Sequence, residues 1–146
     1  MNGGSITSKN GDLFYVTNTN CDITISDVAL TLANDNLLTV AGNSSSRGWG
    51  TEGSNGGNVN FTAESQTMEG NITCDSISTL NMTMKNQTNF KGTVNKAGEA
   101  GTVSVTIDAD STWTLTGDSY ISSFDGDFSS VNTNGYHLYV NGEQVA

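Results

Sequence analysis

A short pattern of alternating residues recurs along this chain and constrains its fold more than any other feature. Each copy reads apolar, small polar, apolar, threonine, apolar, and the four copies occupy residues 28–32, 59–63, 80–84 and 103–107. The last three copies, which begin at Val59, Leu80 and Val103, are almost evenly spaced. Recurrence at such a period is typical of solenoids, in which each repeat forms one coil and buries its apolar side against the next coil.

A second column of residues repeats at a similar spacing. In it an apolar residue precedes a glycine by two positions, and the pairs are Val40 with Gly42, Met68 with Gly70, Phe90 with Gly92 and Leu115 with Gly117. The intervals between these glycines differ from one another only slightly. Two columns with matching, slightly variable periods predict equivalent strands that are joined by loops of different length.

The alternation also predicts which side chains face the core. Val59, Phe61 and Ala63 fall on one side of a strand, whereas Asn60 and Thr62 fall on the other. Strands stacked in parallel, about 4.8 Å apart, place like residues above like. We therefore expect inward columns of apolar residues and outward ladders of threonine and asparagine.

The stacking order that follows from this pattern is specific. Leu80 is expected to cover Val59, and Val103 is expected to cover Leu80. Degenerate copies of the pattern at 13–16 and 136–140 are expected to open and close the solenoid.

The composition agrees with an all-β chain. Ser, Thr and Asn together supply 55 of the 146 residues, and 17 residues are Gly. Because these types crowd a helical backbone or compete with it, the composition disfavours all-helical and doubly wound α/β folds. The net charge of −10 would repel phosphate backbones and anionic membranes. We therefore expect no nucleic-acid partner, and the lack of a long apolar stretch predicts no membrane insertion.

The repeats, together with the segments 111–120 and 134–142, resemble the right-handed parallel β-helix of the pectate-lyase-like family. They are most similar to the C-terminal end of the Ser/Thr/Asn-rich, adhesin-like solenoids that Gram-positive anaerobic bacteria export. The resemblance implies an all-β, single-stranded, right-handed parallel β-helix of about 5–6 turns, each of roughly 20–25 residues. It implies one domain over 1–146, the C-terminal part of a longer protein, with a capping strand in 128–146. It also implies an extracellular or bacterial cell-surface location.

One segment, 43–58, interrupts the repeats. Five of its sixteen residues are Gly and it lies between two predicted strands, so we expect a loop that protrudes from the solenoid. Arg47, Trp49 and Glu52 stand close together in it. A tryptophan face with polar neighbours can stack on a sugar ring and hydrogen-bond it. The alternative is that Trp49 packs on the solenoid wall while Arg47 and Glu52 pair with each other.

Two carboxylate pairs, Asp108 with Asp110 and Asp125 with Asp127, have D-x-D spacing at predicted strand ends. Such oxygen ligands make these four residues candidates for binding calcium. The interpretation that we favour is that they accept hydrogen bonds from turn amides, which Asp commonly does. No other cofactor is expected.

Few residues are candidates for catalytic or redox chemistry. One His, one Arg and four Lys are available to a lyase or hydrolase site, and His137 falls at an outward position of the final strand. Cys21 and Cys74 lack a CxxC spacing and lie in alternating apolar runs, so we expect small buried thiols. We therefore predict that the chain is not an enzyme.

These observations predict a non-catalytic, structural, adhesin-like solenoid of an exported bacterial surface protein. Its expected partner is a polysaccharide or a host-surface glycan. The first alternative is a polysaccharide-binding module that uses the 43–58 loop; a remnant polysaccharide lyase and an ice-binding solenoid, suggested by the outward Thr column, come after it. Because residues 5–7 lead straight into the alternation, we also expect an exposed N-terminal strand edge through which the chain self-associates.

Overall fold

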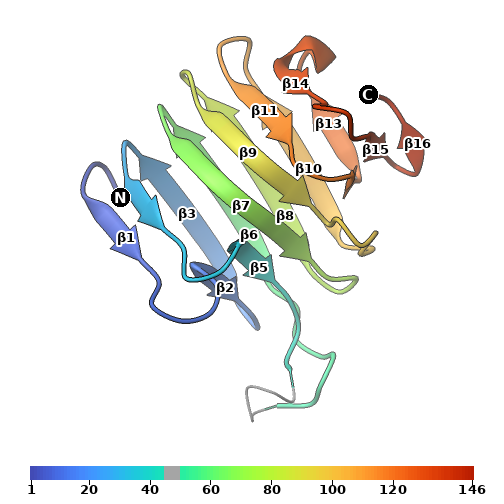
Figure 1. The fold of residues 1–146 in the computed structure, drawn as a ribbon. Helices are drawn as coiled ribbons and strands as arrows, with labels where there is room; N and C mark the ends of the chain where they lie inside the picture. The colour runs from blue at the N-terminus through green and yellow to red at the C-terminus, as the bar shows by residue number, and fades with distance from the viewer. Residues whose placement is uncertain (45–49) are drawn as a thin grey trace.

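The structure is a computed structural model that describes residues 1–44 and 50–146. Nearly all of its regular structure is β-strand, and the strands stack in parallel coils that form a solenoid of about six turns (Figure 1). The predicted all-β class and the stacked parallel coils are therefore confirmed, and the architecture is consistent with a β-helix.

Two long sheets form the main walls of the solenoid. In spatial order, sheet A contains β3 (Asn20–Ser26), β6 (Asn58–Glu64), β8 (Thr79–Lys85), β10 (Thr102–Ile107) and β13 (Ser123–Asp125). Sheet C contains β2 (Phe14–Val16), β5 (Asn36–Val40), β7 (Thr67–Cys74), β9 (Asn89–Val94), β11 (Thr112–Leu115) and β14 (Val131–Asn132). In the middle of the chain, each coil consists of a strand of sheet A followed by a strand of sheet C.

Two smaller sheets lie at the ends. Sheet B pairs β1 (Ser5–Thr7) with β4 (Ala29–Thr31) in parallel, close to the N-terminus. Sheet D pairs β12 (Ser119–Ile121) with β15 (Leu138–Val140) in parallel, and β16 (Glu143–Gln144) folds back antiparallel on β15. A 3-10 turn, η2 (Phe128–Ser130), precedes β14.

The predicted stacking order is correct in the centre of sheet A. Val59 pairs with Leu80, and Leu80 pairs with Val103. All three side chains are at most 1% exposed. On the outward side Thr62 lies beside Thr83. The alternation therefore assigns the inward and outward faces of these strands correctly.

Residues 28–32, the first copy of the repeat pattern, do not continue sheet A. Val59 pairs with Cys21 of β3, whereas β4, which holds most of 28–32, pairs with β1. Residues 21–25 match the repeat pattern as well, with an aspartate at the small polar position. The chain forms β4, β5 and the long loop between β3 and β6, so the paired positions 21 and 59 are far apart in the sequence. Because this interval is much longer than the spacing of the other copies, residues 21–25 are not recognised as part of the same repeat.

The glycine column is correct in the centre of sheet C. Met68 pairs with Phe90, and Gly70 pairs with Gly92. A Cβ atom at position 92 would lie 1.9 Å from Gly70 O and 2.8 Å from the ring of Phe90. The absence of a side chain therefore lets the two strands and the aromatic ring approach each other.

Towards both ends of sheet C the column is out of the predicted register. Leu115 pairs with Gly92, two residues away from the predicted partner. Trp113 thereby stacks on Phe90, with ring centroids 5.8 Å apart, and its Nε1 donates to Gly92 O at 3.1 Å. The register of β5 is likewise shifted against β7, so Gly42 and Gly117 fall outside the column.

The segments 13–16 and 136–140 do not continue sheet A. β2 is an edge strand of sheet C, and β15 lies in sheet D. Asn141 and Gly142 have φ values of 50° and 82° and turn the chain from β15 into β16, as Asn-Gly turns commonly do. The resulting hairpin holds the fully buried side chain of Leu138 at the C-terminal end of the core.

The N-terminal edge of sheet A is covered in part. Asn2 forms a parallel bridge with Ser26, and Ser26 N donates to Met1 O at 2.9 Å. The first residues of the chain therefore run beside the end of β3, an arrangement that the sequence did not predict. Self-association through the remainder of this edge stays a prediction.

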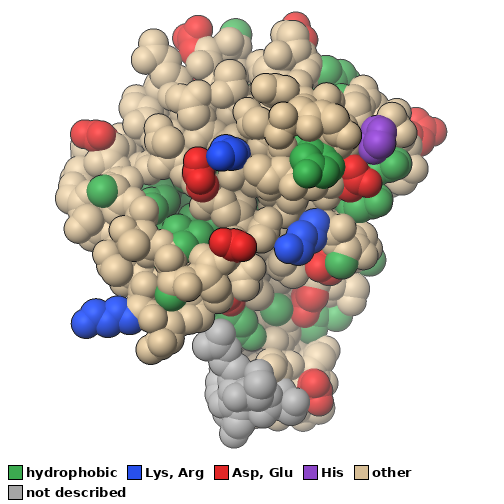
Figure 2. All heavy atoms as spheres, in the orientation of Figure 1, with side chains coloured by type: hydrophobic (Ala, Val, Ile, Leu, Met, Phe, Trp, Pro, Cys, Tyr) green, Lys and Arg blue, Asp and Glu red, His purple; other side chains and the backbone are tan. Residues whose placement is uncertain are grey.

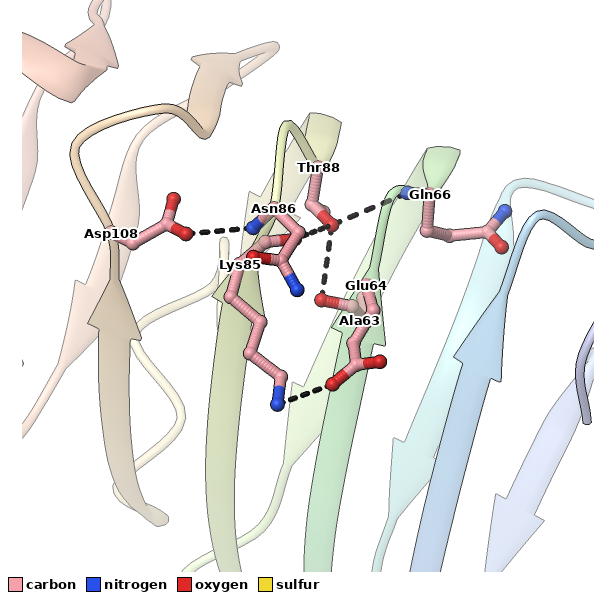
Figure 3. Close-up of polar contacts among 7 residues, drawn as sticks. All are labelled: Ala63, Glu64, Gln66, Lys85, Asn86, Thr88 and Asp108. Carbon is pink, nitrogen blue, oxygen red and sulfur yellow. Dashed lines mark hydrogen bonds and ion pairs between the residues drawn. The ribbon is translucent and has the colours of Figure 1, made fainter.

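Buried polar side chains connect successive coils where sheet A turns into sheet C. Thr88 N donates to Ser111 Oγ at 3.1 Å, and Gln66 N donates to Thr88 Oγ1 at 3.3 Å. The Gln66 side chain in turn bonds both N and O of Val28, at 2.9 and 2.8 Å. Figure 3 shows Thr88 in the turn after β8, with Oγ1 directed at backbone atoms of both coils. These side chains satisfy backbone groups that the sheets leave unpaired.

We predict that Thr88→Val destabilises the fold by about 1–3 kcal/mol, because it removes the acceptor of a buried backbone N–H. Thr106→Val is the matched control, since Thr106 is exposed on sheet A, and we expect a change within about 0.5 kcal/mol. Urea unfolding of both variants measures the difference. Equal stability of the two variants would contradict a role for Thr88 in coil stacking.

Candidate functional site

The connection between β5 and β6 extends away from the solenoid (Figure 1). Its base is closed by two backbone hydrogen bonds, from Asn43 N to Ser54 O at 2.8 Å and from Gly53 N to Asn43 O at 2.9 Å. Gly42 N donates to Asp75 Oδ2 at 2.7 Å, which fixes the start of the loop to the next coil. β6 begins at Asn58, so the connection ends one residue earlier than predicted.

Of the three candidate sugar-binding residues, the described structure includes one. Arg47 and Trp49 lie outside the described residues. Glu52 is exposed in a turn of the same connection. A sugar site formed by this trio therefore stays a prediction.

The carboxylate of Asp108 caps turns of two coils. Its Oδ2 accepts Asn86 N at 2.7 Å (Figure 3). Its Oδ1 accepts Asp110 N at 3.2 Å. The hydroxyl of Ser111, followed by the backbone amide of Asn86, holds the pKa of Asp108 below its usual value. Asp108 thus bonds turn amides, as the favoured interpretation predicted.

The second carboxylate pair lies one coil further along. Asp127 Oδ1 accepts Ser129 N at 2.8 Å and caps η2, and this bond lowers the pKa of Asp127. Asp125 is exposed beside Thr106 on sheet A. Within residues 1–44 and 50–146, no group of three or more His, Cys, Asp or Glu side chains is arranged to hold a metal ion. Calcium binding by these carboxylates stays a prediction.

We predict that Asp108→Asn lowers stability at neutral pH by less than about 1 kcal/mol. Because the folded pKa of Asp108 is lowered, its ionised form stabilises the fold above the unfolded pKa, and this contribution is lost as the pH falls below about 4. The difference between wild type and variant should therefore shrink on acidification. Thermal unfolding between pH 7 and pH 3 measures it, and a difference that is constant with pH would contradict this prediction.

The single histidine lies near the C-terminal end. His137 is exposed, as predicted, and its Nδ1 is 3.2 Å from Asp118 Oδ1. Its backbone N–H donates to the same carboxylate oxygen at 2.9 Å. The side chain therefore takes part in a surface contact between adjacent coils.

The two cysteines lie on different walls. Cys21 is half-buried in β3 of sheet A, and Cys74 is buried in β7 of sheet C; both thiols are free. Burial, with a smaller contribution from the neighbouring Asp75 carboxylate, raises the pKa of the Cys74 thiol to about 12. The expectation of buried thiols is therefore correct for Cys74 and only partly so for Cys21.

We predict that iodoacetamide at pH 8 alkylates Cys21 well before Cys74 in the folded protein. The raised pKa keeps the Cys74 thiol protonated at this pH, and alkylation requires the thiolate. Mass spectrometry of tryptic peptides measures the two rates. In urea the rates should converge, and faster labelling of Cys74 in the folded state would contradict the prediction.

The outward side chains of sheet A form a regular polar surface, which we call the sheet A face. One column runs through Asp22, Asn60, Asn81, Ser104 and Ser123, which are paired in register across five strands. Asn60 Nδ2 donates to Asp22 Oδ1 at 2.7 Å, and Asn81 Nδ2 donates to Asn60 Oδ1 at 3.0 Å. Ser123 Oγ donates to Ser104 Oγ at 2.9 Å. The predicted outward ladder is thus present, with side-chain hydrogen bonds over its first three strands and again over its last two.

Further columns flank this one. Asn58 Nδ2 donates to Asn20 Oδ1 at 2.9 Å, and a hollow of about 360 Å³ lies between this pair and the column of Asn60 and Asn81. Lys85 forms an ion pair with Glu64 near the strand ends (Figure 3). The contribution of β3 to the sheet A face was not predicted from the repeat. The signal was the pattern at residues 21–25, which has the same alternation.

Within the described residues, no helix has the length and apolar character needed to span a bilayer. Comparisons of the chain with family models, with curated proteins and with solved structures found no match. The solenoid architecture is therefore shown by the structure itself, while membership of the pectate-lyase-like or adhesin-like families has no support from relatives.

Proposed function

We propose that this chain is a non-catalytic, adhesin-like solenoid module of an exported bacterial surface protein, and that the sheet A face is its contact surface. The observation that carries the proposal is the column of outward polar side chains on five parallel strands, in which Asp22, Asn60 and Asn81 are hydrogen-bonded in succession and Ser123 is hydrogen-bonded to Ser104. The partner would be a polysaccharide or a host-surface glycan.

The physical support is preorganisation. Asn60 and Asn81 are held by their neighbours in the column, so little side-chain entropy remains to be lost when a ligand binds. An amide has two N–H donors and two acceptor lone pairs. Each of these side chains therefore keeps capacity to bond the hydroxyl groups of a glycan while the column stays intact.

The charge of the chain limits the kind of glycan. With a net charge of −10, the protein disfavours strongly anionic polymers at low ionic strength. The sheet A face itself carries exposed Asp22 and Asp125. A neutral, hydroxyl-rich polymer is therefore the better partner for this surface.

A second candidate is a polysaccharide-binding module that uses the 43–58 loop. The observation in its favour is the projecting connection between β5 and β6, whose base is fixed by backbone hydrogen bonds at Asn43. Loops held on a rigid scaffold commonly carry binding residues. The two candidates differ in which variant abolishes binding.

We predict that the purified chain binds at least one neutral polysaccharide on an array of plant, mucin and bacterial glycans. Asn81→Ala should weaken this binding about tenfold, a change equal to roughly one hydrogen bond of average to good strength. Asn89→Ala is the matched control, because Asn89 is an exposed asparagine on a strand of sheet C. The control should bind like wild type, and both variants should keep the wild-type melting temperature.

The same array distinguishes the alternatives. Binding that is lost in Trp49→Ala and retained in Asn81→Ala would favour the loop over the sheet A face. Release of reducing or unsaturated sugar ends during incubation with the bound polysaccharide would contradict a non-catalytic role. Absence of binding to every glycan would contradict the contact surface.

A further inference from the structure

A groove crosses the outer side of sheet C, on the wall opposite the sheet A face. It has a volume of about 860 Å³ and is lined by residues from four successive stretches of chain, at 30–35, 67–71, 91–96 and 116–117. The first of these stretches leaves sheet B, and the others belong to the coils of β7, β9 and β11. Figure 2 views this side of the molecule and shows basic, acidic and hydrophobic side chains close together over the middle of sheet C.

The groove exists because sheet B does not continue sheet C. β4 pairs with β1, and the chain then passes through residues 32–35 before it joins sheet C at β5. Asn71 N donates to Asp35 O at 2.6 Å, which fastens this segment as a wall beside β7. A Cβ atom at Gly70, which has a φ of 127°, would lie 2.8 Å from Leu32 Cδ2. Glycine at this position therefore allows the wall to stand where it does.

The floor of the groove carries buried polar groups. Thr93 is 2% exposed, and its Oγ1 donates to Asn71 Oδ1 at 2.6 Å. Asn71 is half-buried, and its side chain lies among the groove-lining residues. The hydrogen bond from Thr93 fixes the orientation of the Asn71 side-chain amide, so its Nδ2 donor has a defined position at the floor.

The charges at the groove balance one another. Lys91 lies 3.5 Å from Glu69, and Lys96 and Asp35 add one charge of each sign. Two of the five basic residues of the chain are thus collected at one site on a protein whose net charge is −10. Neither an anion nor a cation gains from this arrangement, whereas a neutral ligand can use each charged group as a hydrogen-bonding partner.

The lining also combines polar groups with an apolar wall. Leu30 and Leu32 are half-buried on one side, and Thr116 is exposed near the other end. The volume falls within the usual range for ligand pockets. Four coils in succession span roughly 14 Å, at about 4.8 Å per step. A chain of sugar rings fits these properties, because each ring offers C–H faces to leucine and hydroxyl groups to amide, ammonium and hydroxyl partners.

We propose that the groove on sheet C binds a neutral oligosaccharide, with Asn71 as the central hydrogen-bonding residue. This site is separate from the sheet A face and from the 43–58 loop, so it goes beyond the function proposed above. It gives the module two carbohydrate contacts, on opposite walls.

The test is an NMR titration of the uniformly ¹⁵N-labelled chain with cellotetraose, mannotetraose and chitotetraose. At least one of these should shift the amide signals of Asn71, Thr93 and Thr116 in a saturable manner, with a Kd of about 1 mM or lower. Tetragalacturonate should bind at least about tenfold more weakly than the best neutral sugar, because it carries the same sign of charge as the protein.

Thr116→Trp places a large side chain in the groove and should weaken binding at least about tenfold. Thr19→Trp is the matched control, since it adds the same side chain at an exposed position in the connection between β2 and β3, outside the groove and the sheet A face, and it should bind tetrasaccharide like wild type. Circular dichroism and melting temperature establish that both variants fold.

Two results would overturn the proposal. In the first, none of the neutral tetrasaccharides shifts the groove signals. In the second, shifts occur only at the sheet A face or in the 43–58 loop, and Thr116→Trp binds like wild type. The second result would leave the proposed function standing and remove only the groove, so the two proposals fail separately.

Discussion

Every strand inside the long walls, between the two edge strands of each sheet, obtains its backbone hydrogen bonds from the coil before it and the coil after it. Backbone groups are most exposed to losing their hydrogen bonds at the corners, where the chain has left one sheet and the next strand has not begun. Gln66, Thr88 and Ser111 occupy equivalent corners of three successive coils, are at most 2% exposed, and bond backbone groups of their neighbours. The apolar columns between the walls can stack only because these corners keep the coils in register, since a buried and unpaired amide would cost as much as a core contact contributes.

The predictability of the fold follows from the same constraint. Between residues 59 and 107 the coils have nearly equal length, so equal spacing in the sequence translates into pairing in space, and the order Val59, Leu80, Val103 could be read directly. Between β3 and β6 the coil contains an additional strand, so the residues that pair in space are more than one ordinary coil length apart in the sequence. The corner residues could not be predicted, because a buried Thr88 and an exposed Thr106 look alike in a chain with 20 threonines.

Of the two candidate binding surfaces, one could be predicted from the sequence and the other could not. The sheet A face follows from period-2 alternation, and only the part contributed by β3 was missed. The groove on sheet C has no local signal, because its wall depends on the approach of Leu32 to Gly70, which lies much later in the chain. The glycine column includes Gly70, but the pattern does not indicate that Leu32 occupies the space that a side chain at position 70 would need. Sequence patterns thus predict surfaces that are formed by corresponding positions of successive repeats. They do not predict surfaces that depend on a segment outside the repeat.

This distinction bears on how such a module acquires binding specificity. Outward positions of the walls contribute little to the core, so their side chains can change while the inward columns and the corner bonds keep the coils stacked. The sheet A face uses such positions only, and its chemistry is therefore free to vary along the solenoid axis. The groove on sheet C also requires Gly70, the buried Thr93 and a wall fastened by Asp35. In a site of that kind, residues that form the binding surface also stabilise the fold. Its ligand specificity can therefore change only through the few lining residues, such as Lys96 and Thr116, that do not contribute to coil stacking.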